Sequence, residues 1–369
     1  MTQTKLHTLT EIGQSVWLDY VQRSFITLGG LQSYIQKGLR GITSNPSLFE
    51  KAIAHSNEYD EQIQQLALQG KSVQEICEEL AVEDARLAAD ALRPVFDETD
   101  GLDGYFSLEV NPHLANDRQG TINEAIRLFS RVDRPNLMIK VPATAEGVLA
   151  FQQLIEEGVN VNVTLMFSMQ QYEQVVEAYL AAMENRAAKV YNLKQMASVA
   201  SIFVSRVDSK VDTMLEAFVT PKAEALKGTI AIANAKMIYQ RYKEYFTSER
   251  WQRLEEKGAR PQRVLYGSTS TKNPAYRDVM YVENLIGPNT VNTVPPKTLE
   301  EFIDHGAVKL TLESELAEAR SQLDGLAELG IQLEDVNREL LEEGLQKFVE
   351  PYDSLIQALE EKKAALITS

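Results

Sequence analysis

Five apolar segments of the sequence each carry a polar or charged side chain close to their C-terminal end. These side chains are Asp19, Asn45, Glu109, Lys140 and Thr164. A lysine amine among carboxylates, amides and hydroxyls is suited to forming a Schiff base with a carbonyl substrate. The amine must lose its proton before it attacks, and burial favours the neutral amine. Two carboxylates can then divide the acid and base steps, because an amine alone cannot dehydrate a carbinolamine or accept a hydroxyl proton.

Side-chain alternation along a strand explains how these residues could meet. In the segment Leu137–Val141 the leucine, isoleucine and valine share one face that suits packing against helices, whereas Met138 and Lys140 point to the other face. The same alternation places Asp19 and Glu109 on an inner face. Burying unpaired charges is costly, so we expect the inward polar side chains to converge at the C-terminal end of a barrel. A solvated lysine at one strand end is the simpler alternative, but it does not account for five coordinated placements.

Strand-like and helix-like segments alternate along the chain. Short β-rich runs are predicted at Val16–Tyr20, Gly41–Ser44, Tyr105–Val110, Leu137–Val141, Val161–Phe167, Ala197–Val204, Arg263–Gly267 and Thr290–Val294. Helical periodicity fills most of the gaps, for instance at Val82–Leu92, Ile122–Val132, Ala145–Glu157, Met169–Ala188 and Ala231–Glu255. Alternation of this kind predicts an α/β protein with a parallel sheet, and eight strands favour a closed (β/α)8 TIM barrel over an open sheet.

The chain is longer than a barrel requires. A (β/α)8 barrel takes about 250 residues, so roughly 100 residues remain for additional helices. We place these helices before Val16, between Phe49 and Arg93 (two helices), in the stretch Asp208–Lys257 and in the C-terminal tail. The sequence therefore predicts a single elaborated domain over residues 1–369, with the barrel at about 14–298 and a C-terminal helical extension at about 299–369.

Composition excludes several classes of protein. The 369 residues carry a net charge of −16, with 44% hydrophobic and 24% charged residues, which is typical of soluble globular proteins. No apolar stretch approaches about 18 residues and no secretory pattern opens the chain, so we expect no membrane association. The acidic balance argues against a nucleic-acid partner. The single cysteine, Cys77, favours a cytoplasmic location and is interpreted as a small buried residue. A monomer and a homodimer both remain open.

The tail is the most acidic part of the chain. Residues 300–369 contain 17 acidic and 6 basic side chains, so this part carries a net charge of −11 and the rest of the chain a net charge of −5. Periodicity predicts two amphipathic helices, Leu312–Leu329 and Ile331–Ile367, separated at Gly330, with a kink or break at Pro351. The acidic side chains are most simply a solvated helix face, and a docking surface for a basic partner is the alternative.

Six segments resemble transaldolase, in that family's order and in its longer bacterial form. Two of them together are specific: Thr43–Ser47 reads Thr-Ser-Asn-Pro-Ser, and Lys140–Thr144 reads Lys-Val-Pro-Ala-Thr. The resemblance extends from about residue 5 to about residue 365. The six segments are Val16–Asp19, Gly41–Ser47, Ser107–Val110, Asn136–Thr144, Gly158–Ser168 and Ser201–Arg206.

The resemblance implies an enzyme of the non-oxidative pentose phosphate pathway. It would move a dihydroxyacetone unit from a ketose phosphate (sedoheptulose 7-phosphate or fructose 6-phosphate) to an aldose phosphate (glyceraldehyde 3-phosphate or erythrose 4-phosphate). Lys140 would form the Schiff base and Asp19 would take the proton of the C4 hydroxyl. Glu109 would move protons through a water molecule held by Thr164. No metal or organic cofactor is implied, because the protonated imine accepts the electrons, and the four histidines show no metal-ligand spacing.

The resemblance also assigns the side chains that bind the sugar phosphates. Asn45, Asn162 and Ser201 would bind hydroxyl groups of the three-carbon unit, and Phe203 is interpreted as part of the site wall.

The phosphate would be held by Arg206 and Lys272, with Ser270 nearby. Two residues depart from the family pattern: Ile202 stands where many members have proline, and Lys272 where many have arginine. Lysine offers a point charge instead of a planar fork, so phosphate binding should survive.

Two other functions remain open from the sequence. A Schiff-base aldolase of the fructose-6-phosphate aldolase type would release free dihydroxyacetone to water, and a tyrosine at the position of Phe203 would favour it. A non-catalytic barrel that binds a partner through its acidic tail is the second alternative. The joint presence of Lys140, Asp19 and Glu109 argues against the second one.

Overall fold

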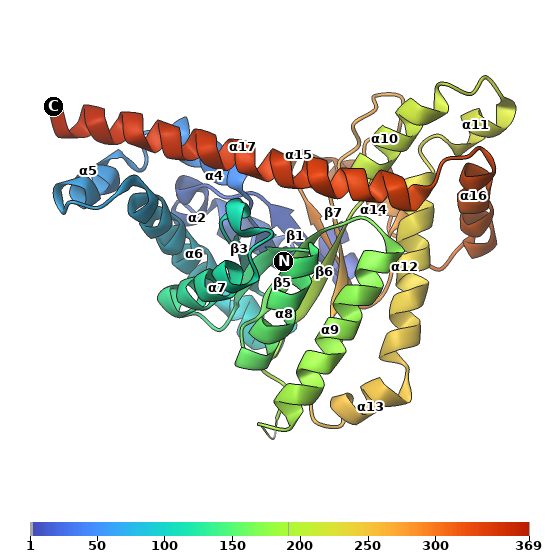
Figure 1. The fold of residues 1–369 in the computed structure, drawn as a ribbon, viewed down its shortest axis with the longest axis horizontal. Helices are drawn as coiled ribbons and strands as arrows, with labels where there is room; N and C mark the ends of the chain where they lie inside the picture. Colours follow the sequence, from blue (N-terminus) through green and yellow to red (C-terminus); the bar gives the residue numbers. More distant parts are fainter. Residues whose placement is uncertain (1–2, 191, 369) are drawn as a thin grey trace.

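Eight parallel strands close into a barrel in sequence order (Figure 1). The computed structural model describes residues 3–190 and 192–368. The strands agree with the predicted runs to within a residue or two, and the prediction of a (β/α)8 barrel with additional helices is confirmed. They are β1 Gln14–Asp19, β2 Gly41–Thr43, β3 Tyr105–Glu109, β4 Leu137–Pro142, β5 Val161–Met166, β6 Ser198–Phe203, β7 Arg263–Gly267 and β8 Thr290–Val294.

Helices surround the barrel and extend beyond it (Figure 1). Several begin where the sequence places a capping side chain: Ser72 accepts from the Glu75 amide, and Thr144 accepts from the Gly147 amide. The helices are α1 Lys5–Glu11, α2 Arg23–Thr27, α3 Gly30–Gln36, α4 Pro46–Ala54, α5 Asp60–Leu68, α6 Val73–Glu98, η1 Pro112–Leu114, α7 Arg118–Val132, α8 Ala145–Glu157, α9 Met169–Ala187, α10 Ser205–Leu215, α11 Pro221–Leu226, α12 Ile230–Phe246, α13 Glu249–Glu255, α14 Met280–Asn284, α15 Pro296–His305, α16 Leu316–Glu328 and α17 Leu333–Thr368.

The structure corrects three helix predictions. The helix predicted at Ala231–Glu255 is divided, because the Ser248 side chain accepts from the Trp251 amide and starts α13 there. The region between Phe49 and Arg93 holds α5, most of α6 and the second half of α4, so it contains three helices and not two.

The predicted break at Pro351 is wrong, because α17 continues through it. Proline inside a helix costs about 3 kcal/mol. Phe348, Leu355 and Leu359 are buried on the same helix, and burying side chains of this size stabilises by about 1.5–3 kcal/mol each. The packing of α17 therefore outweighs the cost of its proline.

The barrel interior has its own small hydrophobic core, separate from the core between the strands and the helices. Met138 belongs to this inner core, as the alternation predicted, together with Trp17, Tyr105, Val199, Leu265 and Val291. At the N-terminal end of the strands, Arg263 pairs with Asp103 at 2.9 Å. The inner core therefore closes the barrel below its C-terminal end.

The strand register sets the polar residues of the C-terminal end next to one another. Glu109 on β3 is paired with Lys140 on β4, and Lys140 is paired with Asn162 on β5. Asp19 on β1 is paired with Thr43 on β2. Side chains at paired positions of parallel strands share a face, so these residues form one layer.

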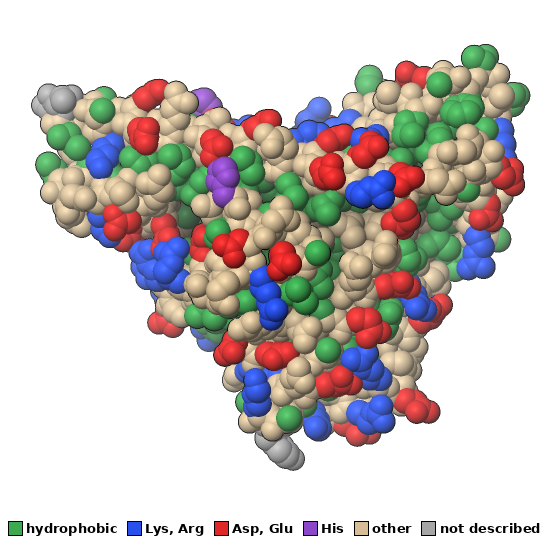
Figure 2. Space-filling model, in the orientation of Figure 1, with side chains coloured by type: hydrophobic (Ala, Val, Ile, Leu, Met, Phe, Trp, Pro, Cys, Tyr) green, Lys and Arg blue, Asp and Glu red, His purple; other side chains and the backbone are tan. Residues whose placement is uncertain are grey.

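The long helix α17 crosses the molecule from the side of α16 to α5 (Figure 1). It packs against α4, α5, α6, α10 and β5 on the way. On the face drawn in Figure 2, the acidic side chains are interspersed with basic and hydrophobic ones, which fits the solvated-face interpretation of the tail. In the part of the chain that the structure describes, no helix is long and apolar enough to span a membrane.

Candidate active site

A cavity of about 330 Å³ opens at the C-terminal end of the strands. Ten of the eleven side chains proposed from the sequence line it, and Glu109 adjoins it through Lys140. The structure therefore brings together residues that are spread over most of the chain. The ten are Asp19, Asn45, Lys140, Asn162, Thr164, Ser201, Phe203, Arg206, Ser270 and Lys272.

The Lys140 amine is buried, with 5% of the residue exposed. Its Nζ atom lies 3.2 Å from Oε2 of Glu109 and donates a hydrogen bond of 2.9 Å to the Ser44 carbonyl oxygen. Ser44 is itself held, because its hydroxyl donates to the Ser107 carbonyl oxygen at 2.7 Å. Contacts from β3 and from the end of β2 thus hold the amine in one place at the cavity wall.

The two carboxylates beside this amine both prefer their protons more than free carboxylates do. Burial raises the pKa of Glu109 to about 7, although Lys140 opposes the shift. Burial also raises the pKa of Asp19, against the attraction of Lys140 and hydrogen bonds from Thr43 and Asn45. A carboxyl that titrates near neutrality can both give and take a proton at physiological pH.

Hydrogen bonds from neighbouring strands orient Asp19. Its Oδ1 atom accepts from the Thr43 hydroxyl at 2.8 Å and lies 3.4 Å from Nδ2 of Asn45. The Thr43 hydroxyl is also 2.7 Å from that of Thr293 on β8. The Oδ1 atom of Asn45 accepts from the Leu48 amide at the start of α4, so its amide group faces Asp19 with its nitrogen.

A second polar chain runs along the opposite wall. The Ser201 hydroxyl donates to Oδ1 of Asn162 at 2.6 Å, and Nδ2 of Asn162 donates to the Ser107 hydroxyl at 3.2 Å. These bonds fix which end of the amide points to which neighbour. The buried Thr164 hydroxyl has no hydrogen-bond partner among the described residues, so it is free to bind a water molecule or substrate.

Two cations, Arg206 and Lys272, also line the cavity. The Cζ atom of Arg206 lies 5.2 Å from the centroid of the Phe203 ring. The buried Nη1 atom of Arg206 has no hydrogen-bond partner in the described chain. Burial and the charge of Arg206 lower the pKa of Lys272, and burial lowers that of Arg206. Lys272 donates to the Ser270 hydroxyl at 2.6 Å. An anion bound beside these two cations would stabilise their charged forms, which burial disfavours. Arg206 and Lys272 therefore suit a phosphate group.

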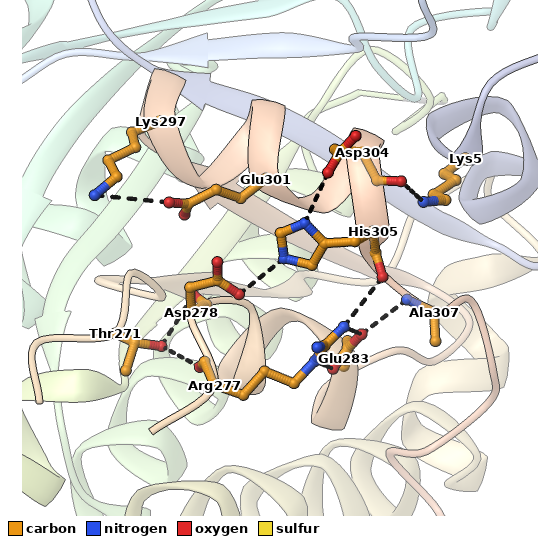
Figure 3. Close-up of polar contacts among 10 residues, drawn as sticks. All are labelled: Lys5, Thr271, Arg277, Asp278, Glu283, Lys297, Glu301, Asp304, His305 and Ala307. Atoms are coloured by element: carbon orange, nitrogen blue, oxygen red, sulfur yellow. Dashed lines mark hydrogen bonds and ion pairs between the residues drawn. The ribbon is translucent and has the colours of Figure 1, made fainter. Parts of the chain in front are cut away.

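Side-chain contacts hold the loop that carries Ser270 and Lys272 (Figure 3). The Thr271 hydroxyl lies 2.9 Å and 3.0 Å from the carbonyl oxygens of Arg277 and Asp278. The Asp278 carboxylate is 2.9 Å from Nε2 of His305, at the end of α15. Arg277 in turn pairs with Glu283 through two bonds. Side-chain contacts therefore fix this loop where the barrel strands do not.

Sequence reasoning missed several residues of the cavity wall. Thr43 and Thr293 lie on strand faces that the alternation rule covers, so the same argument could have found them. Lys51 on α4 and Phe348 on α17 also line the cavity. The amphipathic pattern of the tail predicts a buried face, but no local signal tells which part of that face meets the barrel.

Cys77, outside the cavity, matches its sequence-based interpretation. Cys77 is buried, and burial raises the pKa of its thiol to about 12, so it is a small buried residue and not a reactive thiol. It borders a second cavity of about 180 Å³, which Glu109 and Asn45 also border. In the described ranges, no cluster of histidine, cysteine and acidic side chains has the arrangement of a metal site.

Comparisons with known proteins agree with this geometry. The family model described as Transaldolase/Fructose-6-phosphate aldolase matches residues 16–359. A transaldolase of Trichodesmium erythraeum is 48% identical over 98% of both chains. A transaldolase 2 of Nostoc punctiforme and a transaldolase of Thermobifida fusca are 45% and 44% identical, again over 98% of both chains. The resemblance seen in the motifs is confirmed, and the chain belongs to the transaldolase/fructose-6-phosphate aldolase family.

Proposed function

We propose that this protein is a transaldolase that carries a dihydroxyacetone unit from a ketose phosphate to an aldose phosphate through a Schiff base on Lys140. One observation carries the proposal. The buried Lys140 amine lies 3.2 Å from the Glu109 carboxylate and lines one cavity together with Asp19 and the two cations Arg206 and Lys272. Groups that suit the reaction and cations that suit a phosphate therefore line one cavity.

The reaction begins at the ketose carbonyl. Lys140 Nζ attacks this carbon, and the resulting carbinolamine loses water to form the imine. Glu109, whose pKa of about 7 suits transfer in both directions, gives and takes the protons of these steps. The unpartnered Thr164 hydroxyl holds the water molecule through which the protons move.

Cleavage follows at the C3–C4 bond. Asp19 accepts the proton of the C4 hydroxyl, the bond breaks, and its electron pair moves into the protonated imine. The aldose phosphate product leaves, while the three-carbon unit stays bound to Lys140. An acceptor aldose phosphate then enters, and the same steps run in reverse, with Asp19 returning the proton. The imine is the electron sink, so these steps need no metal or organic cofactor.

Polar side chains around the amine hold the sugar in place for these steps. Asn45, Asn162 and Ser201 bind the hydroxyl groups of the three-carbon unit. Arg206, Lys272 and Ser270 bind the phosphate. Donor and acceptor share one phosphate position, because each carries its phosphate at the end remote from the reacting carbon.

The proposal also concerns the setting of the enzyme. Its substrates are sugar phosphates, and the reaction belongs to the non-oxidative pentose phosphate pathway. Sugar phosphates are metabolites of the cytoplasm, so we propose that the enzyme works there. The single cysteine is compatible with a reducing compartment.

Trapping the intermediate tests the chemistry. The protein is incubated with fructose 6-phosphate, reduced with borohydride and digested, and the adduct is located by peptide mass. We expect one reduced adduct, on Lys140. An adduct on another lysine, or none, would remove the mechanism.

A second assay separates transferase from aldolase. Erythrose 4-phosphate is added with fructose 6-phosphate, and release of glyceraldehyde 3-phosphate is followed. We expect turnover to depend on the acceptor. Turnover at the same rate without acceptor, with free dihydroxyacetone accumulating, would identify an aldolase instead.

A further inference from the structure

One face of α17 forms part of the active-site wall. Phe348 lines the cavity and is 5% exposed, and its ring centroid lies 5.7 Å from Nζ of Lys140. Gly344, four residues earlier on the same helix face, lies against Leu165 and Arg206. The tail helix therefore contacts the cavity both beside Lys140 and beside Arg206.

Contacts on both sides of Phe348 hold the helix in this position. Toward the start of α17, Lys210 on α10 lies 2.6 Å from both Glu339 and Glu343. Toward its end, Lys362 lies 2.7 Å from Asp60 at the start of α5. The aromatic ring thus sits on a segment that is fixed at two sites, so its place beside Lys140 does not depend on a free chain end.

The surroundings of Lys140 are asymmetric. Glu109 and the Ser44 carbonyl oxygen offer polar contacts on the barrel side. On the α17 side stands a phenyl ring, which can neither donate nor accept a normal hydrogen bond. The ring is buried and forms part of the cavity wall, and apolar groups that close a site exclude water from it.

Water matters because the covalent intermediate has two possible fates. In transfer, its carbon nucleophile adds to the acceptor aldehyde. In release, C3 of the three-carbon unit takes a proton delivered by bulk water instead of bonding to the acceptor, and hydrolysis of the resulting imine then breaks the C–N bond. That second sequence frees dihydroxyacetone and restores the Lys140 amine, and it consumes one water molecule.

We propose that Phe348 is a specificity-determining residue that keeps bulk water, as distinct from the water molecule held by Thr164, from the Lys140 intermediate and so commits the three-carbon unit to transfer. This inference rests on the proposed function. It adds a residue of the C-terminal extension to a site otherwise built on the barrel and its loops. The acidic tail then has a role in the reaction through its buried face, separate from its solvated one.

The ratio of release to transfer tests the inference. Each variant is given fructose 6-phosphate, and free dihydroxyacetone is measured against sedoheptulose 7-phosphate formed with erythrose 4-phosphate. We expect Phe348→Ala to raise this ratio by about tenfold or more, because bulk water gains access to the carbon nucleophile and can protonate it. Phe348→Leu, which keeps most of the apolar volume, should raise it much less. The borohydride adduct on Lys140 should persist in both variants.

Leu359→Ala is the matched control, because Leu359 is a buried side chain of α17 outside the cavity wall. It should lower stability and leave the ratio unchanged. An unchanged ratio in Phe348→Ala, or an equal rise in Leu359→Ala, would overturn the inference. If Phe348→Ala does not fold, the test uses the ratio of release to transfer in Phe348→Leu. A small rise in that ratio supports the inference, and no rise overturns it. Failure of the wild-type protein to trap an adduct on Lys140 would instead defeat the proposed function itself.

Discussion

Two groups of charged side chains in the cavity are positioned in different ways. We call the part around Lys140 the amine end, and the part around Arg206 and Lys272, proposed to bind phosphate, the phosphate end. At the amine end, Lys140, Glu109 and Asp19 stand on barrel strands, and the strand register pairs Glu109 with Lys140 and Asp19 with Thr43. At the phosphate end, Arg206 stands at the start of α10 and Lys272 on the loop after β7. Barrel strands are fixed by a continuous hydrogen-bond ladder, whereas a loop is held only by the side chains behind it. The reaction needs fixed atoms where bonds change, and phosphate binding tolerates some freedom.

This difference predicts that changes at the amine end affect chemistry and that changes at the phosphate end affect binding. Five measurements test the contrast, from the largest expected effect to the smallest.

Removing the amine should abolish the reaction. In Lys140→Met the covalent route is lost, so we expect no borohydride adduct and no measurable transfer. Lys236→Met is the matched control, because Lys236 is another buried lysine, 3% exposed and bonded to the Ser314 carbonyl oxygen. An adduct that survives in Lys140→Met would show that another lysine carries the intermediate.

Replacing the cleavage base should separate two steps. Asp19→Asn keeps the shape and the contact with Thr43 but cannot accept the C4 hydroxyl proton. We expect kcat to fall by about 10²–10⁴ while imine formation with fructose 6-phosphate persists. Rapid-quench trapping of the adduct alongside product release measures both. Equal loss of both steps would assign this carboxylate to imine formation.

Stability should report the burial of Glu109. The folded pKa is about 7 against 4.5 for the free group, so between these values the folded protein binds more protons than the unfolded chain. This group's contribution to stability is therefore full below pH 4.5 and falls by about 3 kcal/mol as pH rises to 7. Denaturant unfolding from pH 4.5 to 8 should show a smaller decline in Glu109→Gln than in the wild type. An identical pH dependence in both would contradict the assignment.

The phosphate end should respond in KM. In Lys272→Ala we expect KM for fructose 6-phosphate to rise about tenfold with kcat little changed, because the phosphate is bound equally in ground and transition states. Lys272→Arg should bind at least as well as the wild type. A large fall in kcat in Lys272→Ala would mean that this loop positions the reacting carbon as well.

The smallest effect is expected behind the phosphate loop. Hydrogen bonds to Asp278 and Asp304 raise the pKa of His305, which keeps this exposed imidazole charged to a higher pH than a free one (Figure 3). His305→Ala should raise KM by less than about fivefold, because exposed ion pairs contribute little. Steady-state kinetics at pH 6 and pH 8 measure this difference in KM. We expect the KM values of the wild type and of His305→Ala to lie closer together at pH 8. A change in kcat would refute a purely positional role.

Much of the site followed from local patterns. The alternation of apolar and polar residues in Leu137–Val141 predicted that Lys140 and Met138 face inward, and they do. The amine and phosphate residues were then assigned by resemblance, and they line one cavity. One local prediction failed in part: of the kink or break predicted at Pro351, the break is wrong, because the helix continues through the proline while distant parts of the chain pack along it.

The sequence by itself determined which strand residues face the barrel interior, because side-chain direction in a strand depends only on neighbours one or two positions away. It also determined the family, through motifs that lie within single segments. Only the tertiary structure decided that Phe348 of the tail stands beside Lys140 and that His305 contacts Asp278 behind the loop of Ser270 and Lys272. These contacts join segments far apart in the chain. They arise from how complete elements pack, and a pattern of nearby residues carries no record of that packing.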